Sequence, residues 1–146
     1  MPMTTFDRLV GLPLLRLHQR AYEITGGRWG HRVGRVRMLL LRTTGRRSGR
    51  ERTAALQYHR DGDRLIVVAS KGGSDERPGW LINLQAHPDV EVQIGTRRFP
   101  ARARVATADE QERLWPVMTA IWPDYDRYQA QTSRRIPLVV LEPTGR

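Results

Sequence analysis

Apolar residues recur at helical spacing near the start of the chain, within the stretch TTFDRLVGLPLLRLHQRAYEI. Gly11 and Pro13 interrupt this pattern, which therefore predicts one kinked helix or two short ones. The opposite side of the helix is polar and carries arginines. We expect an amphipathic helix over residues 5–25 that either packs on the domain or acts as a lid or a membrane-surface contact. Its apolar side would consist of Phe6, Leu9, Val10, Leu14 and Leu17.

Further along, short apolar runs bounded by turn signals predict β-strands. The first strand is VRMLLLRT, which is apolar and short enough to be a buried strand. The runs RTAALQYHR and RLIVVAS flank the turn DGD at residues 61–63, and an Asp-Gly pair between apolar runs is a strong hairpin signal. The second and third strands are therefore expected to be antiparallel neighbours.

Alternation of apolar and polar residues predicts a second hairpin. The alternation runs through VEVQI and again through RRFPARARVA, and Gly95 with Thr96 supplies the turn between the two strands. Near the end of the chain, the run IPLVVLE predicts a last strand that closes the sheet.

Helices are predicted between these strands. Pro78 opens the short helix GWLINLQAH, and Pro88 closes it. Thr107 followed by Glu110 forms a capping box ahead of a longer amphipathic helix, which Pro123 ends or kinks before a polar helical segment. Mainly antiparallel strands interrupted by helices are typical of a small, partly closed barrel, because closure hides the sheet edges. Such barrels bind ligands in clefts at their mouths.

Composition and charge narrow the function. With 146 residues, the chain is expected to form one domain, 1–146, whose core needs no metal or disulfide. The net charge of +10 favours acidic partners such as phosphates, carboxylates, nucleic acid or anionic lipid. There is no cysteine, so a redox reaction would need a bound cofactor. With no apolar run of about 18 residues and no signal-peptide pattern, we expect a soluble, cytoplasmic protein.

The stretch TTGRRSGRER, residues 43–52, combines several arginines with glycines and a serine. Glycines let backbone N–H groups point into a common concavity, Ser48 adds a hydroxyl, and arginine guanidinium groups match phosphate or carboxylate oxygens. We therefore predict an anion-binding turn, and the alternative is a solvated arginine-rich turn. The stretch lacks the pattern GxxxxGK[ST], so it is not a nucleotide P-loop.

Two further stretches carry candidate ligand-binding side chains. In ASKGG, residues 69–73, glycine backbone lets a ligand approach closely, and Ser70 and Lys71, the only lysine of the chain, are hydrogen-bond donors. The alternative is an ordinary loop after a strand. In WPDYDRY, aromatic residues recur at every third position and would form one wall of a pocket, although core packing also accounts for the tryptophan. They are Trp122, Tyr125 and Tyr128.

Metal-dependent and hydrolytic chemistry are not favoured. The histidines are scattered along the chain, without the spacing of metal ligands and without an HExxH pattern on a helix. There is no GxSxG nucleophile motif, and no clear pairing of acid and base carboxylates. We therefore expect no metal site and no hydrolase site.

Three stretches, taken together, resemble the deazaflavin-dependent nitroreductase family, the split β-barrel enzymes that use the reduced deazaflavin coenzyme F420. They lie in family-like order over residues 36–143: LLLRTTGRRSGRERTAAL, DGDRLIVVASKGGSDERPGWLINLQAHPDVEVQI and YDRYQAQTSRRIPLVVLEP. The resemblance is to the nitroreductase and quinone-reductase branch. It implies an α+β fold, a split β-barrel of about six mainly antiparallel strands with flanking helices, similar to FMN-binding split barrels.

The resemblance also implies which residues bind coenzyme F420. That coenzyme carries a phosphodiester and an oligoglutamate tail, so an arginine-rich turn would bind a ligand that is acidic along much of its length. The implied cofactor-binding residues are Arg46, Arg47, Ser48 and Arg52 for the acidic groups, Ser70, Lys71, Gly72 and Gly73 along the same groove, and Ala54, Ala55, Leu56 and Trp80 around the ring. The ring and the substrate would meet at the implied catalytic residues Ser70, Trp122, Tyr125 and Tyr128.

The implied reaction is hydride transfer from C5 of the reduced deazaflavin to a quinone, enone or nitroaromatic acceptor. Ser70 or Tyr125 would donate a hydrogen bond to the acceptor oxygen as negative charge develops on it. Family members often have proline at or beside the position of Ala55, and a tyrosine is expected at the position of Trp122. This sequence departs from the family pattern at both positions, and the departures bear on substrate choice. The protein would act as a monomer or a homodimer.

Three alternatives remain open at this point. One is an FMN-binding split-barrel protein, because FMN also combines a phosphate with a tricyclic ring. A second is a nucleic-acid-binding barrel, for which the net charge and the stripe of Arg98, Arg102 and Arg104 argue, although this stripe lacks interleaved aromatic residues. The third is a protein that binds the cofactor without turnover.

Overall fold

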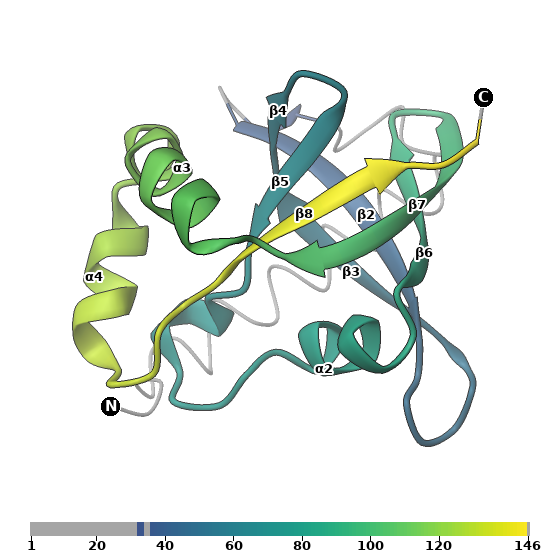
Figure 1. Ribbon diagram of the computed structural model, residues 1–146, viewed down its shortest axis with the longest axis horizontal. Helices are drawn as coiled ribbons and strands as arrows, with labels where there is room; N and C mark the ends of the chain where they lie inside the picture. The colour runs from purple at the N-terminus through teal and green to yellow at the C-terminus, as the bar shows by residue number, and fades with distance from the viewer. Residues whose placement is uncertain (1–31, 34–35, 146) are drawn as a thin grey trace.

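The computed structural model describes residues 32–33 and 36–145, with side chains described from Arg37 onward. The predicted amphipathic helix over residues 5–25, with its expected lid or membrane contact, lies outside the described residues. The described part is a curled antiparallel sheet with helices packed against it (Figure 1). This confirms the predicted α+β fold of split-barrel type.

All strand pairs in the sheet are antiparallel, and the order is β1-β2-β6-β7-β8-β5-β4, with β3 paired to β2. The last strand is not an edge strand, because it lies between β7 and β5. The strands are β1 (Arg32–Val33), β2 (Val36–Thr44), β3 (Glu51–Gln57), β4 (His59–Asp61), β5 (Arg64–Val68), β6 (Asp89–Ile94), β7 (Arg97–Val105) and β8 (Leu138–Pro143).

The helices begin and end where local sequence signals place them. The α3 helix starts at the predicted capping box, in which the Glu110 backbone N–H donates to Thr107 Oγ1 at 3.2 Å and the Thr107 backbone N–H donates to Glu110 Oε1 at 2.9 Å. Pro123 separates α3 from α4, as expected for a helix breaker. The helical segments are η2 (Lys71–Gly73), a single 3-10 turn, α2 (Gly79–Ala86), α3 (Ala108–Ile121) and α4 (Asp124–Gln131).

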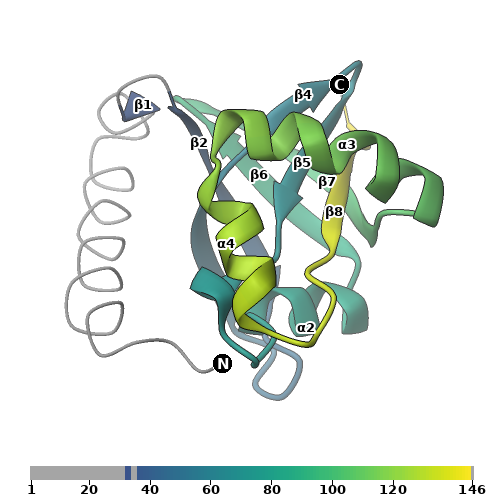
Figure 2. The same cartoon turned by 90° about the vertical axis from the view of Figure 1, so that its left-hand side faces the viewer.

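Two hydrophobic cores lie on opposite faces of β5 and β8. Leu65 and Val67 face one core, which includes α2, whereas Ile66 and Val68 face the other, which is formed with α3 and α4. Figure 2 shows α3 and α4 lying over this second face. A strand that is buried on both faces reads as a continuous apolar run, which explains the sequence of β5.

One predicted strand pairing forms only in part. The DGD hairpin forms, but it joins only β4 to β5, over the three pairs from His59↔Ile66 to Asp61↔Arg64. The predicted second strand is broken at the buried Tyr58, and its first part, β3, pairs along β2 instead of continuing along β5. The two strands therefore diverge, and residues from both line an open cleft.

Candidate functional site

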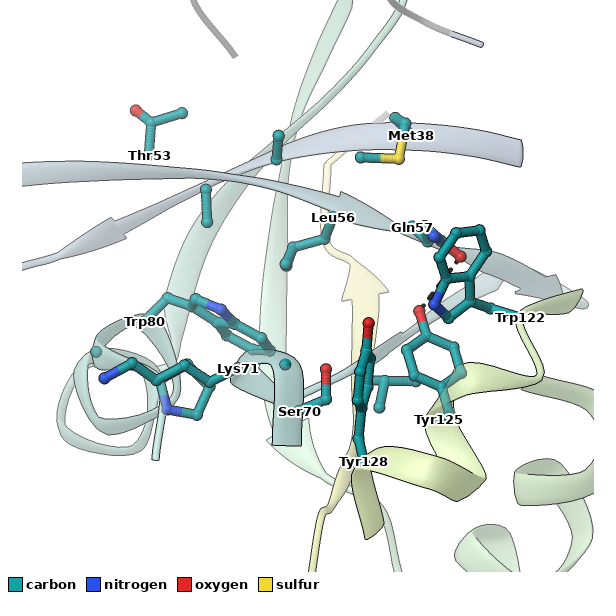
Figure 3. Close-up of a pocket in the computed structure, with 16 residues that line it drawn as sticks. Met38, Thr53, Leu56, Gln57, Ser70, Lys71, Trp80, Trp122, Tyr125 and Tyr128 are labelled. Atoms are coloured by element: carbon teal, nitrogen blue, oxygen red, sulfur yellow. Dashed lines mark hydrogen bonds between the residues drawn. The ribbon is translucent and has the colours of Figure 1, made fainter. Parts of the chain in front are cut away.

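The main cleft has a volume of about 550 Å³ and lies between β3, the Ser70–Gly72 loop, the start of α2 and the aromatic residues at the α3–α4 junction (Figure 3). The sequence-predicted site residues that line it are Ala54, Ala55, Leu56, Ser70, Lys71, Gly72, Trp80, Trp122, Tyr125 and Tyr128. Residues from four separate parts of the chain thus meet in one cavity. The adjacent Gly73 is buried and packs against α4.

A second cavity, of about 380 Å³, adjoins the main cleft and is lined by the arginine turn. Thr53, Ala54, Gly79 and Trp80 line both cavities, so the two form one continuous groove. The predicted anion-binding residues that line this second cavity are Arg46, Arg47, Ser48 and Arg52. The structure therefore brings every sequence-predicted site residue to this groove or, for Gly73, directly beside it.

The arginine turn folds back on itself through its own backbone. The Gly45 N–H donates to the Arg50 carbonyl at 2.7 Å, and the Gly49 N–H donates to the Gly45 carbonyl at 2.8 Å. Gly49 has a φ of 70°, which glycine adopts without strain. Ser48 Oγ accepts a hydrogen bond from the Arg50 N–H at 3.1 Å, so the hydroxyl also stabilises the turn.

Asn83, on α2, positions the turn and was missed by the sequence analysis. Its Oδ1 accepts hydrogen bonds from the Arg46 backbone N–H at 3.2 Å and from Arg46 Nη1 at 3.0 Å. Its Nδ2 donates to Thr43 Oγ1 at 3.3 Å. The available signal was an asparagine between the apolar residues Ile82 and Leu84 of this short helix. Because a neutral amide holds Arg46, this contact leaves the guanidinium charge uncompensated.

The turn is rich in positive charge that nearby acids do not neutralise. Among the residues that the structure describes, no carboxylate lies within ion-pair distance of Arg46, Arg47, Arg50 or Arg52. Arginines elsewhere on the surface do have such partners, as in the pair of Arg113 with an aspartate at 3.0 Å. The groove beside the turn is therefore suited to an anionic ligand.

The loop after β5 has an uncommon backbone conformation. Lys71, Gly72 and Gly73 have φ values of 46°, 62° and 82°, so one non-glycine residue lies in the left-handed region. Lys71 Nζ forms an ion pair with Glu76 Oε2 at 2.9 Å. In Figure 3, Ser70 lies on the floor of the cleft between Trp80 and Tyr128. Strain of this kind is found mostly at functional sites.

The aromatic wall is built around Tyr125. Its hydroxyl donates to Gln57 Oε1 at 3.3 Å, across the cleft from α4 to β3. Its ring packs edge-on against Tyr128, with centroids 6.3 Å apart. Burial, and secondarily Tyr128, raise the pKa of Tyr125, so this phenol stays protonated at physiological pH. Gln57 was also missed by the sequence analysis, because its partner is 68 positions away.

These features fit one type of ligand. The aromatic and apolar cleft suits a planar ring, and the adjoining arginine groove suits an acidic tail attached to that ring. The β3 strand adds a third feature: it pairs only with β2 in the described sheet, so its other edge has main-chain groups available to the cleft. The fold and the groove define a split-barrel protein that binds a cofactor with a ring and an anionic tail.

Comparison with known proteins identifies the family. Residues 14–143 match the model of the F420H(2)-dependent quinone reductase family. The chain is 46% identical, over 139 residues, to the F420H(2)-dependent quinone reductase Rv1261c of Mycobacterium tuberculosis (strain ATCC 25618 / H37Rv), covering 92% of this chain and 93% of that protein. The chain therefore belongs to the F420H(2)-dependent quinone reductase family. It is an oxidoreductase whose cofactor is reduced coenzyme F420.

Solved structures agree with this assignment. An F420-H2 dependent reductase, FDR-A, is 36% identical and superposes with a TM-score of 0.66, covering 72% of this chain and 93% of that chain. A protein described as a domain-swapped dimer is 31% identical and superposes with a TM-score of 0.69, covering 90% of this chain and 99% of that chain. Both similarities support the split-barrel assignment.

The part of the chain that the structure describes contains no group of three or more histidine, cysteine, aspartate or glutamate residues placed to hold a metal ion. None of the helices in the same residues is both long enough and apolar enough to cross a membrane.

Proposed function

We propose that the protein transfers a hydride from reduced F420 to a quinone, enone or nitroaromatic acceptor bound in the main cleft. The observation that carries this proposal is the continuity between an aromatic cleft and a groove of arginines without carboxylate partners among the described residues. Family membership supports the cofactor, and the name of the Mycobacterium relative supports a quinone as acceptor.

The residues of the groove would divide the binding of the cofactor between them. Guanidinium groups of the turn hold its acidic groups, and the open edge of β3 faces its ring, with Trp80 at the junction between the two cavities. When bound, the reduced deazaflavin supplies the hydride. The cofactor-binding residues in this proposal are Arg46, Arg47, Ser48, Arg52, Ala54, Ala55, Leu56, Lys71, Gly72 and Trp80, with Gly73 supporting the loop.

The acceptor would lie against the aromatic wall, where the protein holds it and excludes water. Negative charge develops on an acceptor oxygen during reduction, and preformed hydrogen-bond donors stabilise it. In the described structure, neither the Ser70 hydroxyl nor the Tyr128 hydroxyl has a hydrogen-bond partner, whereas the Tyr125 proton is directed at Gln57. Of the two predicted donors, Ser70 is therefore favoured over Tyr125, which acts chiefly as a rigid part of the wall beside Trp122.

The nucleic-acid alternative receives less support from the surface charges. Arg98, Arg102 and Arg104, the stripe along β7, each lie within 4.0 Å of a carboxylate on a neighbouring strand or on α3. Their charge is thus partly compensated, unlike that of the arginine turn. The stripe also lies outside the aromatic cleft, whereas the cavity of the arginine turn adjoins that cleft.

Anaerobic stopped-flow kinetics test this proposal. The oxidation of reduced F420 is followed with a quinone, an enone and a nitroaromatic compound, in the wild type and in the variants Ser70→Ala, Tyr125→Phe and Ser133→Ala. Loss of one preformed donor costs about 100-fold in rate, so Ser70→Ala should be slow. Tyr125→Phe should retain most of its activity, and Ser133, which is exposed and outside the cleft, provides the control. Failure of the wild type to oxidise reduced F420 with any acceptor contradicts the proposal.

A further inference from the structure

Arg134, in the segment between α4 and β8, donates hydrogen bonds to the loop that follows β5, residues 69–74. Its Nε donates to the Ser74 carbonyl at 2.8 Å, and its Nη2 donates to the carbonyls of Ala69 at 3.1 Å and Ser70 at 2.9 Å. One guanidinium therefore bonds the loop at both its beginning and its end. Arg134 does not line the cleft itself, so any effect on ligands acts through the loop.

The loop needs such support because its conformation is costly. Lys71 has a φ of 46°, and strained residues persist only where surrounding contacts determine their conformation. The backbone contacts within the loop are the Gly73 N–H to the Ser70 carbonyl at 3.0 Å and the Ser74 N–H to the Lys71 carbonyl at 3.2 Å. The Ser70 carbonyl thus accepts from both Gly73 and Arg134, and the guanidinium reinforces the turn that places the Ser70 side chain.

Arg134 is itself fixed by the helix that carries the tyrosines. Its backbone carbonyl accepts from Gln129 Nε2 at 2.8 Å, and its backbone N–H donates to Thr132 Oγ1 at 3.3 Å. The same helix packs directly on the loop, since a Cβ added at Gly73 would lie 2.9 Å from Tyr128 Cα. Arg134 therefore connects two walls of the cleft, one that carries Ser70 and one that carries Tyr128.

We propose that Arg134 is a positioning residue that sets the distance between Ser70 on the loop and the tyrosines of α4, and so the placement of the acceptor. This inference rests on the proposed function, and it adds a residue that touches neither cofactor nor acceptor. The guanidinium geometry is required, because a lysine ammonium retains the charge but cannot bond the carbonyls at both ends of the loop. Arg134→Lys therefore separates the role of the guanidinium from that of the charge.

Amide hydrogen exchange tests the clamp without any turnover. In Arg134→Lys, the amides of Gly73 and Ser74 should exchange about tenfold faster or more, because the loop opens more readily. The exchange rate of the amide of Val67, a buried residue of β5, should not change. The matched control is Arg135→Lys, the same substitution at the neighbouring position, where the side chain is exposed and has no hydrogen bond among the described residues. Unchanged exchange in Arg134→Lys overturns the proposal.

Single-turnover kinetics then test whether Arg134 acts through Ser70. Misplacement of a reacting group by about 1 Å costs up to about 100-fold, so Arg134→Lys should slow hydride transfer by about 10- to 100-fold at saturating cofactor. The double variant Ser70→Ala/Arg134→Lys should be no slower than the slower single variant, because both changes remove the same contribution. Rate losses that multiply, or a wild-type rate in Arg134→Lys, overturn the proposal.

Thermal unfolding of the variants, together with the activity of the wild type, distinguishes the remaining outcomes. Arg134→Lys should keep a Tm close to that of the wild type, and Arg134→Gln, which can still donate to one carbonyl, provides a second folded variant. If neither variant folds, Arg134 is needed for folding and the proposed positioning role is wrong. If the wild type reduces no acceptor, the proposed function fails, whereas the exchange measurement still decides whether Arg134 holds the loop.

Discussion

Replacement of Asn83 by aspartate tests whether the charge of the arginine turn binds an acidic ligand. Asn83 is 4% exposed, and its Oδ1 accepts from the backbone N–H and from Nη1 of Arg46 at 3.2 and 3.0 Å. Aspartate has nearly the same shape and can keep both contacts. The hydroxyl of Thr43, which now accepts from Asn83, can rotate to donate instead. Asn83→Asp should therefore add one negative charge to the turn while the fold is retained.

The size of the effect follows from Coulomb's law. Two negative charges on opposite sides of one guanidinium lie about 7 Å apart, and at an effective dielectric constant of about 20–40 they repel each other by about 1–2 kcal/mol. Such a repulsion raises the Kd of an acidic ligand by about 5- to 30-fold. Because salt screens charges near the surface, the difference from the wild type should shrink as ionic strength rises.

A fluorescence titration with oxidised F420, at low and at high salt, measures this change in Kd. Gln85→Glu is the control, since it adds the same charge to the same helix, at an exposed residue that contacts Arg77 at 3.4 Å and not the turn. Its Kd should stay within about twofold of that of the wild type. If a folded Asn83→Asp variant binds F420 as tightly as the wild type, the turn does not bind the acidic tail.

Two further predictions concern stability. The Arg104 guanidinium lowers the pKa of Glu110 to about 2, so this carboxylate stabilises the fold above its ordinary pKa of 4.5, and the contribution is lost as the pH falls from there through about 2. Glu110→Gln should lower the free energy of unfolding, measured in urea, by about 1–2 kcal/mol at pH 7, with solvent screening taken into account. Near pH 2 the same substitution should lower it by little. A difference in free energy of unfolding that does not change with pH contradicts this prediction. Gly73→Ala should lower the free energy of unfolding more than Gly62→Ala does. Both glycines have a positive φ, but of the two only Gly73 faces close neighbours, with Tyr128 Cα 2.9 Å from the added Cβ. Equal losses of free energy in the two variants contradict the close packing of α4 on the loop.

Features that depend on near neighbours in the chain could be predicted from the sequence. The capping box at Thr107 needs only a glutamate three residues later, and the turn at Gly95 and Thr96 needs only alternating residues on either side. The backbone of the arginine turn is likewise closed by residues within a few positions of one another. The cofactor class followed from the resemblance of these stretches to a known family, and the comparisons confirmed it.

Features that depend on the path of the sheet could not be predicted. The break at Tyr58 moves β3 away from β5 and opens the cleft, but the DGD turn signal is the same with or without that break. Gln57 meets Tyr125 across 68 positions, and Arg134 reaches the Ser70 carbonyl across 64. Neither residue type is unusual where it stands, so only the fold assigns these side chains to the site.

A titration of the purified wild-type protein with oxidised F420 decides whether the groove binds this cofactor, and FMN and a single-stranded oligonucleotide serve as parallel ligands. Fluorescence of the coenzyme reports binding, and the titration is repeated at several salt concentrations. F420 should bind tightly, and its binding should weaken as salt rises because acidic groups occupy the arginine groove. The other two ligands should bind much more weakly. Absence of F420 binding, beside firm binding of FMN or of the oligonucleotide, would contradict this prediction.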